Sequence, residues 1–163
     1  MSDTSNSPPR TADVLVVGSG IAGCAAALAA AREGDEVLLV TKASEPEDAS
    51  SDWAQGGIAT TRGDPESLKA DIIEASANTA DPDAVDVLVD NAAPAVRDVL
   101  LDTLDIDFDT LGADYDFAQE AAHSEERILH VDASTGQHIL RPFLSNLSDV
   151  DNVEILEDTT ALE

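Results

Sequence analysis

The chain has 163 residues, of which 43% are hydrophobic, 34 are acidic and only 8 are lysine or arginine, so its formal net charge is −26. This length allows one domain with a packed core, while the scarcity of basic residues excludes a nucleic-acid-binding surface. No apolar run reaches membrane-spanning length and the first ten residues show no signal-peptide pattern, so we expect a cytoplasmic protein.

The first half of the sequence predicts a strand–helix–strand unit. Residues 1–12 are rich in Ser, Thr, Asn and Pro, and we expect them to be flexible. A buried parallel strand follows at about 13–17, then a helix that ends at Gly34 and a second buried strand at about 36–41. Residues 42–62 then form a long loop with room for a short helix, and loops of this length are usually functional.

The second half predicts helices and short strands. We expect helices at about 65–78 and 82–104, with Asp81 as the N-cap of the second and Pro82 in its first turn. Short strands are predicted at "IDFD", "YDF", "RILHV" and "VEIL", and a helix is predicted over "STGQHILRPFLSNLSD". Together these elements indicate an α/β fold with a parallel sheet.

A glycine pattern lies between the first strand and the first helix. Gly18, Gly20 and Gly23 have the spacing G-x-G-x-x-G. The first allows a tight turn, the second lets the backbone approach a pyrophosphate, and the third lets the helix pack close to the strand. The helix N-terminus offers backbone N–H groups to the phosphates. In this context the pattern indicates a dinucleotide-binding fold.

The end of the second strand departs from the usual dinucleotide-binding pattern. An acidic residue commonly stands there and binds the ribose hydroxyls. Thr41 and Lys42 occupy that place instead, and the nearest acids come later in the loop. On the residues alone, two hypotheses remain open. Lys42 reads the 2′-phosphate of NADP, or a flavin-binding variant uses the hydroxyl and the lysine.

The stretch "SSDWAQGGIA", residues 50–59, has one acidic and no basic residue and is rich in small and uncharged polar residues, although the chain as a whole is strongly acidic. Gly56 and Gly57 permit the backbone to lie against a flat ligand, and Gln55 can both donate and accept hydrogen bonds. Backbone amides aimed at an isoalloxazine ring would tune a flavin. The alternative is an ordinary glycine loop with Trp53 as an apolar anchor.

The motifs "DVLVVGSGIAG", "VTK", "SSDWAQGGIA" and "HSEERILHVDASTG" together resemble the L-aspartate oxidase family, within the succinate dehydrogenase/fumarate reductase flavoprotein superfamily. The resemblance implies a Rossmann-like FAD-binding fold. It also implies FAD-dependent oxidation of L-aspartate to iminoaspartate in NAD (quinolinate) biosynthesis, with oxygen or fumarate as electron acceptor. A succinate- or fumarate-type flavoprotein subunit and a non-catalytic FAD-binding fragment are the alternatives.

The resemblance also implies how the cofactor is held. Ser50 stands where succinate dehydrogenases have the histidine that bonds to FAD, so non-covalent FAD is implied. The family commonly has Ser or Thr followed by Lys at the end of the second strand, which favours the flavin hypothesis. The residues implied in cofactor binding are Gly18, Ser19, Gly20, Ile21, Ala22, Gly23, Thr41, Lys42, Ser50, Ser51, Asp52, Trp53, Ala54, Gln55, Gly56 and Gly57.

A second motif concerns the substrate. "QEAAHS", residues 119–124, is similar to the family's substrate-side signature "REGGHS". Glu120 matches the acid that orients the substrate, whereas Gln119 replaces an arginine and two alanines replace glycines. Two readings of Glu120 stay open: a substrate contact, or a surface acid beside a helix.

The resemblance implies that further domains belong to such a protein. Family members are considerably longer, and their capping and helical domains and catalytic residues would follow Glu163. Residues 13–163 are therefore expected to be the N-terminal portion of an FAD-binding domain that is inactive alone. Arg127 and Arg141 are the only late basic residues that could meet a carboxylate substrate.

The remaining candidate groups favour structural roles. The three histidines, His123, His130 and His138, have no cysteine partners at metal-ligand spacing, so no metal site is predicted. The lone Cys24 excludes an internal disulfide and is expected to be a small core residue.

The acidic residues are spread along the whole chain. A tail would concentrate them, and a disordered chain would lack the periodic apolar runs. At 1 M salt the Debye length falls to about 3 Å, which screens the self-repulsion of such a surface. We therefore expect a halophilic protein that is folded in molar KCl and loses structure in dilute buffer.

Overall fold

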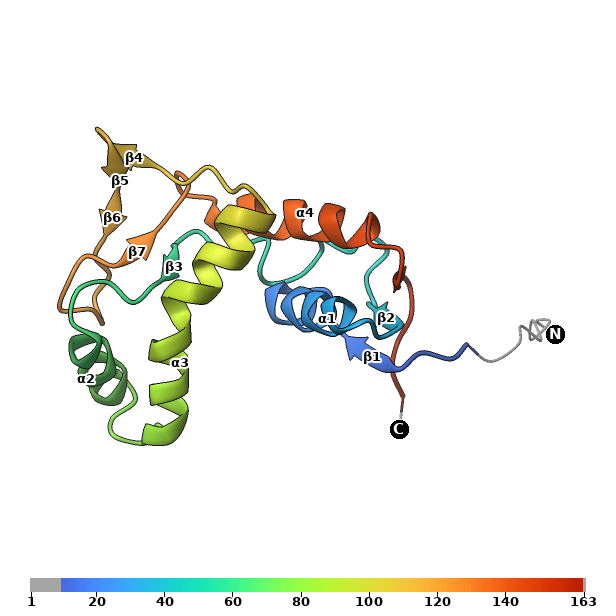
Figure 1. Cartoon of the computed structure of the whole chain (residues 1–163), viewed down its shortest axis with the longest axis horizontal. Helices are drawn as coiled ribbons and strands as arrows, with labels where there is room; N and C mark the ends of the chain where they lie inside the picture. The colour runs from blue at the N-terminus through green and yellow to red at the C-terminus, as the bar shows by residue number, and fades with distance from the viewer. Residues whose placement is uncertain (1–9, 163) are drawn as a thin grey trace. The chain divides into compact units, whose positions relative to one another are not determined.

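The computed structural model describes residues 10–162 (Figure 1). The described residues divide into two compact units, 10–49 with 144–162 and 50–143, and each unit has sheet structure of its own. The expected flexible N-terminus falls largely outside the described residues. Its last three residues, 10–12, form no helix or strand.

The first unit is built on a parallel sheet. Its strands are β1 (Val14–Val17), β2 (Val37–Val40) and β8 (Val153–Leu156), and β2 lies in the middle. The helix α1 (Ile21–Glu33) packs against β1 and β2 (Figure 1). Runs of Val, Leu and Ile form the strands because branched side chains fit a buried, pleated surface. The predicted strand–helix–strand unit and parallel sheet are thus confirmed. The first strand, however, is not buried as predicted, because Leu15 and Val17 are 59% and 62% exposed.

The end of α1 is fixed by a glycine and by a distant asparagine. Gly34 adopts φ 95°, and its N–H bonds back to the last turn of the helix. The side-chain amide of Asn152 donates to the carbonyl oxygens of Ala31 at 3.0 Å and Asp35 at 2.8 Å. These bonds tie the segment before β8 to the end of the helix.

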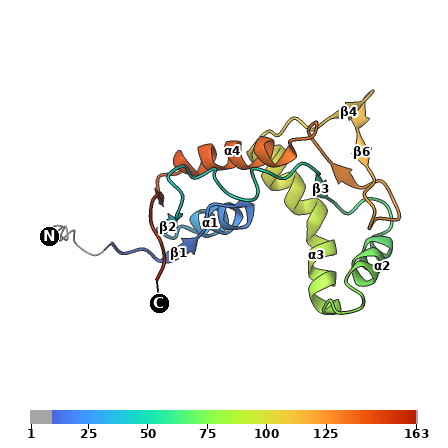
Figure 2. The ribbon, with the colours of Figure 1, turned by 180° about the vertical axis from the view of Figure 1, so that it is seen from behind.

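In the second unit, α2 (Pro65–Ala75) and α3 (Pro82–Ala95) lie side by side, as Figures 1 and 2 both show. Leu68, Val85 and Val89 form their shared buried core. Each helix starts at an aspartate whose carboxylate accepts a backbone N–H two residues on, followed by a proline. The predicted Asp81 cap is confirmed.

The long helix predicted over residues 82–104 changes its pitch on the way. After α3, the chain continues as the π-helical segment η1 (Val96–Thr103), in which the N–H of Leu104 bonds to the carbonyl of Val99. Pro94 has no N–H to give to the regular ladder. The local loss of that bond accounts for a wider turn at this place.

Two small antiparallel sheets complete the second unit. One has the order β3-β7-β6, from β3 (Ile58–Ala59), β7 (Ile128–Leu129) and β6 (Phe117–Ala118). The other pairs β4 (Thr110–Leu111) with β5 (Asp114–Tyr115).

Two predictions from the sequence differ from the structure of the second unit. The predicted "IDFD" strand is wrong: Ile106 and Phe108 are buried, as their alternation suggests, but residues 105–109 pair with no strand. The predicted loop over residues 42–62 contains β3 near its end.

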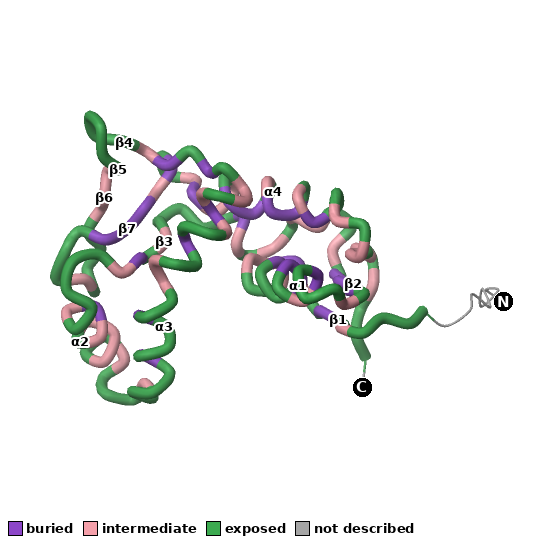
Figure 3. Tube along the Cα trace, viewed as in Figure 1, coloured by how far each residue is buried: buried purple, intermediate pink, exposed green. Residues whose placement is uncertain are grey.

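The helix α4 (Thr135–Ser148) begins in the second unit and its last turn belongs to the first. Figure 3 shows buried positions along α4. The buried apolar residues of this helix are Ile139, Leu140, Phe143, Leu144 and Leu147. Among residues 10–162, no helix has the length and apolar character needed to cross a membrane.

Candidate functional site

The glycine pattern of the first unit forms a turn in which backbone touches backbone. Gly18 adopts φ 107°, and its N–H donates to the carbonyl of Val40 at 2.8 Å. A Cβ on Gly23 would lie only 1.9 Å from the carbonyl oxygen of Gly18. Any side chain at this position would push α1 away from the turn, so the glycine spacing has the packing role that the sequence indicates.

The start of α1 suits an anion. Gly20 is the N-cap, in an extended conformation, and no side chain caps the helix. The first turn, which includes Ala22, carries no acidic residue even though the chain is so rich in acids. A phosphate at this end would meet backbone N–H groups and the positive end of the helix dipole.

Ser19 and Thr41 are both buried, and their hydroxyl groups form hydrogen bonds within the protein. The hydroxyl of Ser19 donates to the carbonyl of Pro46 at 2.5 Å and lies 3.2 Å from Oγ1 of Thr41. The glycine turn is thereby tied to the end of β2, where Lys42 is exposed. As predicted cofactor residues, Ser19 and Thr41 can therefore offer mainly their main chain.

In the second unit, the predicted cofactor residues 50–57, called here the 50–57 loop, sit on the start of α4. The N–H of Gly136 donates to the carbonyl of Ala54 at 2.9 Å. A Cβ on Gly136 would lie 2.0 Å from the carbonyl oxygen of Ser51. The loop and the helix therefore meet backbone to backbone, and only glycine fits between them.

Asp52 lies on the inner side of this loop. Its side chain is 7% exposed, and its two oxygens accept hydrogen bonds from Nε and Nη2 of Arg141 at 3.0 and 3.1 Å. Trp53, by contrast, is 73% exposed, and Gln55 is also on the outside. The aspartate thus has only its main chain to offer a ligand.

Gly56 and Gly57 let neighbouring segments, one of which carries Glu120, pack closely against the 50–57 loop. A Cβ on Gly57 would lie 2.2 Å from the carbonyl oxygen of Leu129, because the chain passes directly into β3 beside β7. A Cβ on Gly56 would lie 2.6 Å from Oε1 of Glu120, which follows β6 in the same sheet. The carboxylate of Glu120 therefore rests against the 50–57 loop.

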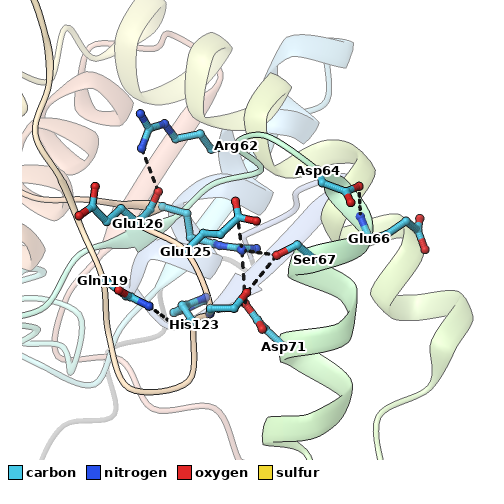
Figure 4. Close-up of polar contacts among 11 residues, drawn as sticks. Arg62, Asp64, Glu66, Ser67, Asp71, Gln119, His123, Glu125 and Glu126 are labelled. Atoms are coloured by element: carbon cyan, nitrogen blue, oxygen red, sulfur yellow. Dashed lines mark hydrogen bonds and ion pairs between the residues drawn. The ribbon is translucent and has the colours of Figure 1, made fainter.

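The segment that carries Glu120, residues 119–126 between β6 and β7, is anchored to α2 (Figure 4). Ser124 donates its amide and its hydroxyl to Oδ2 of Asp71 at 2.8 and 3.0 Å. The backbone hydrogen bond from Ser124 is the main cause that lowers the pKa of Asp71. We call residues 119–126 the Glu120 loop.

A buried arginine completes this anchor. Arg127 is fully buried, its Nη2 donates to Oγ of Ser67 at 2.8 Å, and the same nitrogen lies 3.3 Å from Asp71. Among residues 10–162, its Nε and Nη1 find no hydrogen-bond partner. Because Asp71 and Ser67 stand one turn apart on α2, one face of the helix holds both the loop and the arginine.

Neither this anchor nor the Asp52–Arg141 pair is predicted from the sequence. Arg127 and Arg141 are considered there as cations for a substrate, yet Arg127 is buried and Arg141 pairs with Asp52. One signal was available, the one-turn spacing of Ser67 and Asp71. Their partners stand too far away in the sequence for spacing to reveal.

The predicted site residues thus form two groups. The first unit brings together Gly18–Gly23, Thr41 and Lys42, and the second unit brings together residues 50–57 and Glu120.

Comparison with known proteins gives a consistent picture. The family described as "FAD binding domain" matches residues 13–163. The L-aspartate oxidase of Halobacterium salinarum is 66% identical over 153 residues, and that of Synechocystis sp. is 39% identical over 153 residues. The alignments cover 94% and 92% of this chain, but 30% and 27% of those relatives. The chain therefore spans less than a third of their length.

Solved structures show the same fold. The Mycobacterium smegmatis Sdh1 complex in the apo form matches with a TM-score of 0.84 at 21% identity, over 91% of this chain and 28% of that one. An E. coli quinol fumarate reductase matches with a TM-score of 0.83 at 22% identity, over 90% and 26%. At this level of identity the likeness concerns the fold.

Proposed function

The chain belongs to the FAD binding domain family, and from this premise we propose that it forms part of the FAD site of an enzyme that oxidises L-aspartate to iminoaspartate. The identity to L-aspartate oxidases supports this activity. The observation that carries the proposal is the carboxylate of Glu120, which rests against Gly56 in the loop predicted to hold the flavin.

Each unit, taken by itself, has residues that fit a part of FAD. The uncapped start of α1, behind the Gly18 turn, offers backbone donors to a pyrophosphate. Gly56 and Gly57 leave one stretch of the 50–57 loop without side chains, so a flat ring could lie on its backbone. FAD, when bound, supplies an acceptor for hydride. Ser50 carries no imidazole, which supports non-covalent binding.

Glu120 has the chemistry for one part of the substrate. A carboxylate binds a substituted ammonium ion through charge-assisted hydrogen bonds, and L-aspartate carries such a group at the carbon to be oxidised. Succinate and fumarate lack it. Glu120 would therefore orient the amino acid and favour it over an unsubstituted dicarboxylate. The anchor to Asp71 keeps the Glu120 loop in place while the substrate binds.

Three finer statements belong to the same proposal. Oxygen or fumarate would accept the electrons, since either could reoxidise a reduced flavin. The protein would act in the cytoplasm as a halophilic enzyme, which its net charge of −26 supports. Residues 13–163 would be the N-terminal portion of the FAD-binding domain, with the residues that bind the substrate carboxylates supplied elsewhere in the enzyme.

The test uses the protein expressed from the complete reading frame, in molar KCl, with FAD. We expect L-aspartate added without oxygen to bleach the flavin absorbance, and succinate to leave it unchanged. Acid precipitation should release the flavin into solution. Glu120→Gln should slow bleaching by about 10- to 100-fold while FAD affinity stays the same. Glu126→Gln, in the same exposed loop, is the matched control and should match the wild type.

The alternatives predict different results. FAD uptake without bleaching by L-aspartate would favour the non-catalytic FAD-binding fragment, and bleaching by succinate would favour a succinate-type flavoprotein. A protein with no affinity for FAD would contradict the proposal as a whole.

A further inference from the structure

The ion pair between Asp52 and Arg141 lies beneath the loop that is predicted to hold the flavin. Both carboxylate oxygens accept hydrogen bonds from the guanidinium, at 3.0 and 3.1 Å, so the pair is bidentate. Nε2 of Gln137, one turn earlier on α4, lies 3.5 Å from Oδ2 of Asp52. The aspartate is therefore held from one face of one helix.

The carboxylate of this pair is more buried than that of the Lys69–Asp86 pair in the same unit. The side chain of Asp52 is 7% exposed and that of Asp86, which lies 2.8 Å from Lys69, is 56% exposed, whereas Arg141 is 54% and Lys69 is 21% exposed. Salt screens exposed charges strongly and buried charges much less. We therefore expect the two hydrogen bonds to the buried carboxylate of Asp52 to persist in the salt in which this chain is expected to fold.

The backbone around Asp52 is held at the same place. The Gly136 N–H bonds to the carbonyl of Ala54, and the carbonyl of Ser51 touches Gly136. On the outer side, Trp53 and Gln55 are exposed. Residues 51–54 are thus held by contacts with Gly136 at the start of α4, while Trp53 and Gln55 remain exposed on the side that would face a ligand.

We propose that Asp52 and Arg141 form a clamp that orders the 50–57 loop before the cofactor arrives. Asp52 is then a positioning residue that acts through Arg141, and its carboxylate is not a ligand of the cofactor. A loop fixed in advance loses less conformational entropy on binding, so the clamp raises the affinity for FAD. This inference rests on the proposed function of the loop in FAD binding, but the ordering of the loop is testable without FAD.

Trp53 makes the test direct, because it is the only tryptophan of the chain and follows Asp52. Its fluorescence anisotropy in the FAD-free chain in molar KCl reports how firmly the loop is held, and its quenching by FAD reports affinity. We expect Asp52→Asn to lower the anisotropy and to weaken FAD binding about tenfold. Arg141→Lys should do the same, because a lysine cannot form the bidentate contact.

The matched control is Asp86→Asn, which makes the same chemical change in an ion pair whose carboxylate is exposed. It should leave the anisotropy and the FAD affinity of the wild type unchanged. Circular dichroism of every variant shows whether it is folded, and Arg141→Lys keeps the charge should Asp52→Asn fail to fold.

The outcomes separate the two proposals. If folded Asp52→Asn and Arg141→Lys keep wild-type anisotropy and FAD affinity, the clamp is refuted. If the wild type shows no quenching by FAD, the proposed function fails, and the anisotropy alone then decides whether the clamp orders the loop.

Discussion

Ser124 donates its amide and its hydroxyl to the same carboxylate oxygen of Asp71, at 2.8 and 3.0 Å. That oxygen also lies 3.3 Å from Nη2 of the fully buried Arg127. One carboxylate thus joins α2, the Glu120 loop and a buried cation. Because a buried charge without its partner is costly, Asp71 is expected to matter for the stability of this unit as well as for the position of Glu120.

Asp71→Asn should lower the free energy of unfolding by about 2–3 kcal/mol at pH 7, because Arg127 loses its nearest opposite charge. Hydrogen bonding from Ser124 lowers the pKa of Asp71 below its ordinary 3.8. A lowered folded-state pKa stabilises the protein above the unfolded-state value, and this contribution is lost as the pH falls through the folded-state value. The difference between wild type and variant should therefore shrink below about pH 4.

Urea denaturation in molar KCl at pH 7 and at pH 3 measures this difference. Glu126→Gln, on the same loop, is the control and should unfold like the wild type at both values. An undiminished difference at pH 3 would show that the carboxylate charge is not the stabilising group.

The two loop glycines should respond differently to the same methyl group. A Cβ on Gly57 meets the backbone carbonyl of Leu129 at 2.2 Å, which cannot move without disturbing β7. Gly57→Ala should therefore cost about 1–3 kcal/mol of stability. A Cβ on Gly56 meets the end of the flexible Glu120 side chain. Gly56→Ala should leave the thermal midpoint almost unchanged and displace the carboxylate.

Thermal unfolding and steady-state kinetics of the complete enzyme separate the two variants. We expect Gly56→Ala to raise the KM for L-aspartate. The expectation fails if both variants unfold at the same lowered temperature, or if Gly56→Ala keeps the wild-type KM.

Cys24 can report folding through its reactivity. Burial raises the pKa of its thiol to about 12, so almost no thiolate exists at pH 8. In molar KCl the thiol should not react with a chromogenic disulfide reagent, and it should react at once in urea. Fast reaction in molar KCl without denaturant would show that the α1 side of the sheet is not packed as described.

Salt should control the stability of the whole chain. We expect the thermal midpoint, followed by circular dichroism, to rise with KCl concentration because salt screens the net charge of −26. Replacing an exposed acid of α3, as in Asp90→Asn, should shift this dependence to lower salt. A sharp transition of the wild type in dilute buffer would refute the halophilic proposal.

The parallel sheet of the first unit is predictable because its signals are local. The short runs of branched residues, the glycine spacing at Gly18 and the end of α1 at Gly34 are each defined by a few consecutive residues. The resemblance to L-aspartate oxidases is confirmed by the family match and by the identity to relatives.

The second unit is less predictable because its strands have two residues each. Ile106 and Phe108 alternate like a strand because they are buried, yet burial alone does not supply a pairing partner. The contacts that fix the candidate site join residues far apart in the sequence, such as Asp52 with Arg141. No local sequence pattern predicts such pairs, because each partner alone is an ordinary charged residue.

The contact between Gly136 and the carbonyl of Ser51 has a practical consequence for protein engineering. The conformation of residues 51–54 is encoded partly in the second residue of a helix that lies far downstream. Grafting these residues alone into another scaffold would transfer their sequence but not their conformation. A successful transplant must carry the beginning of α4 with it, and a library that varies Gly136 would reshape the loop without altering any of its own residues.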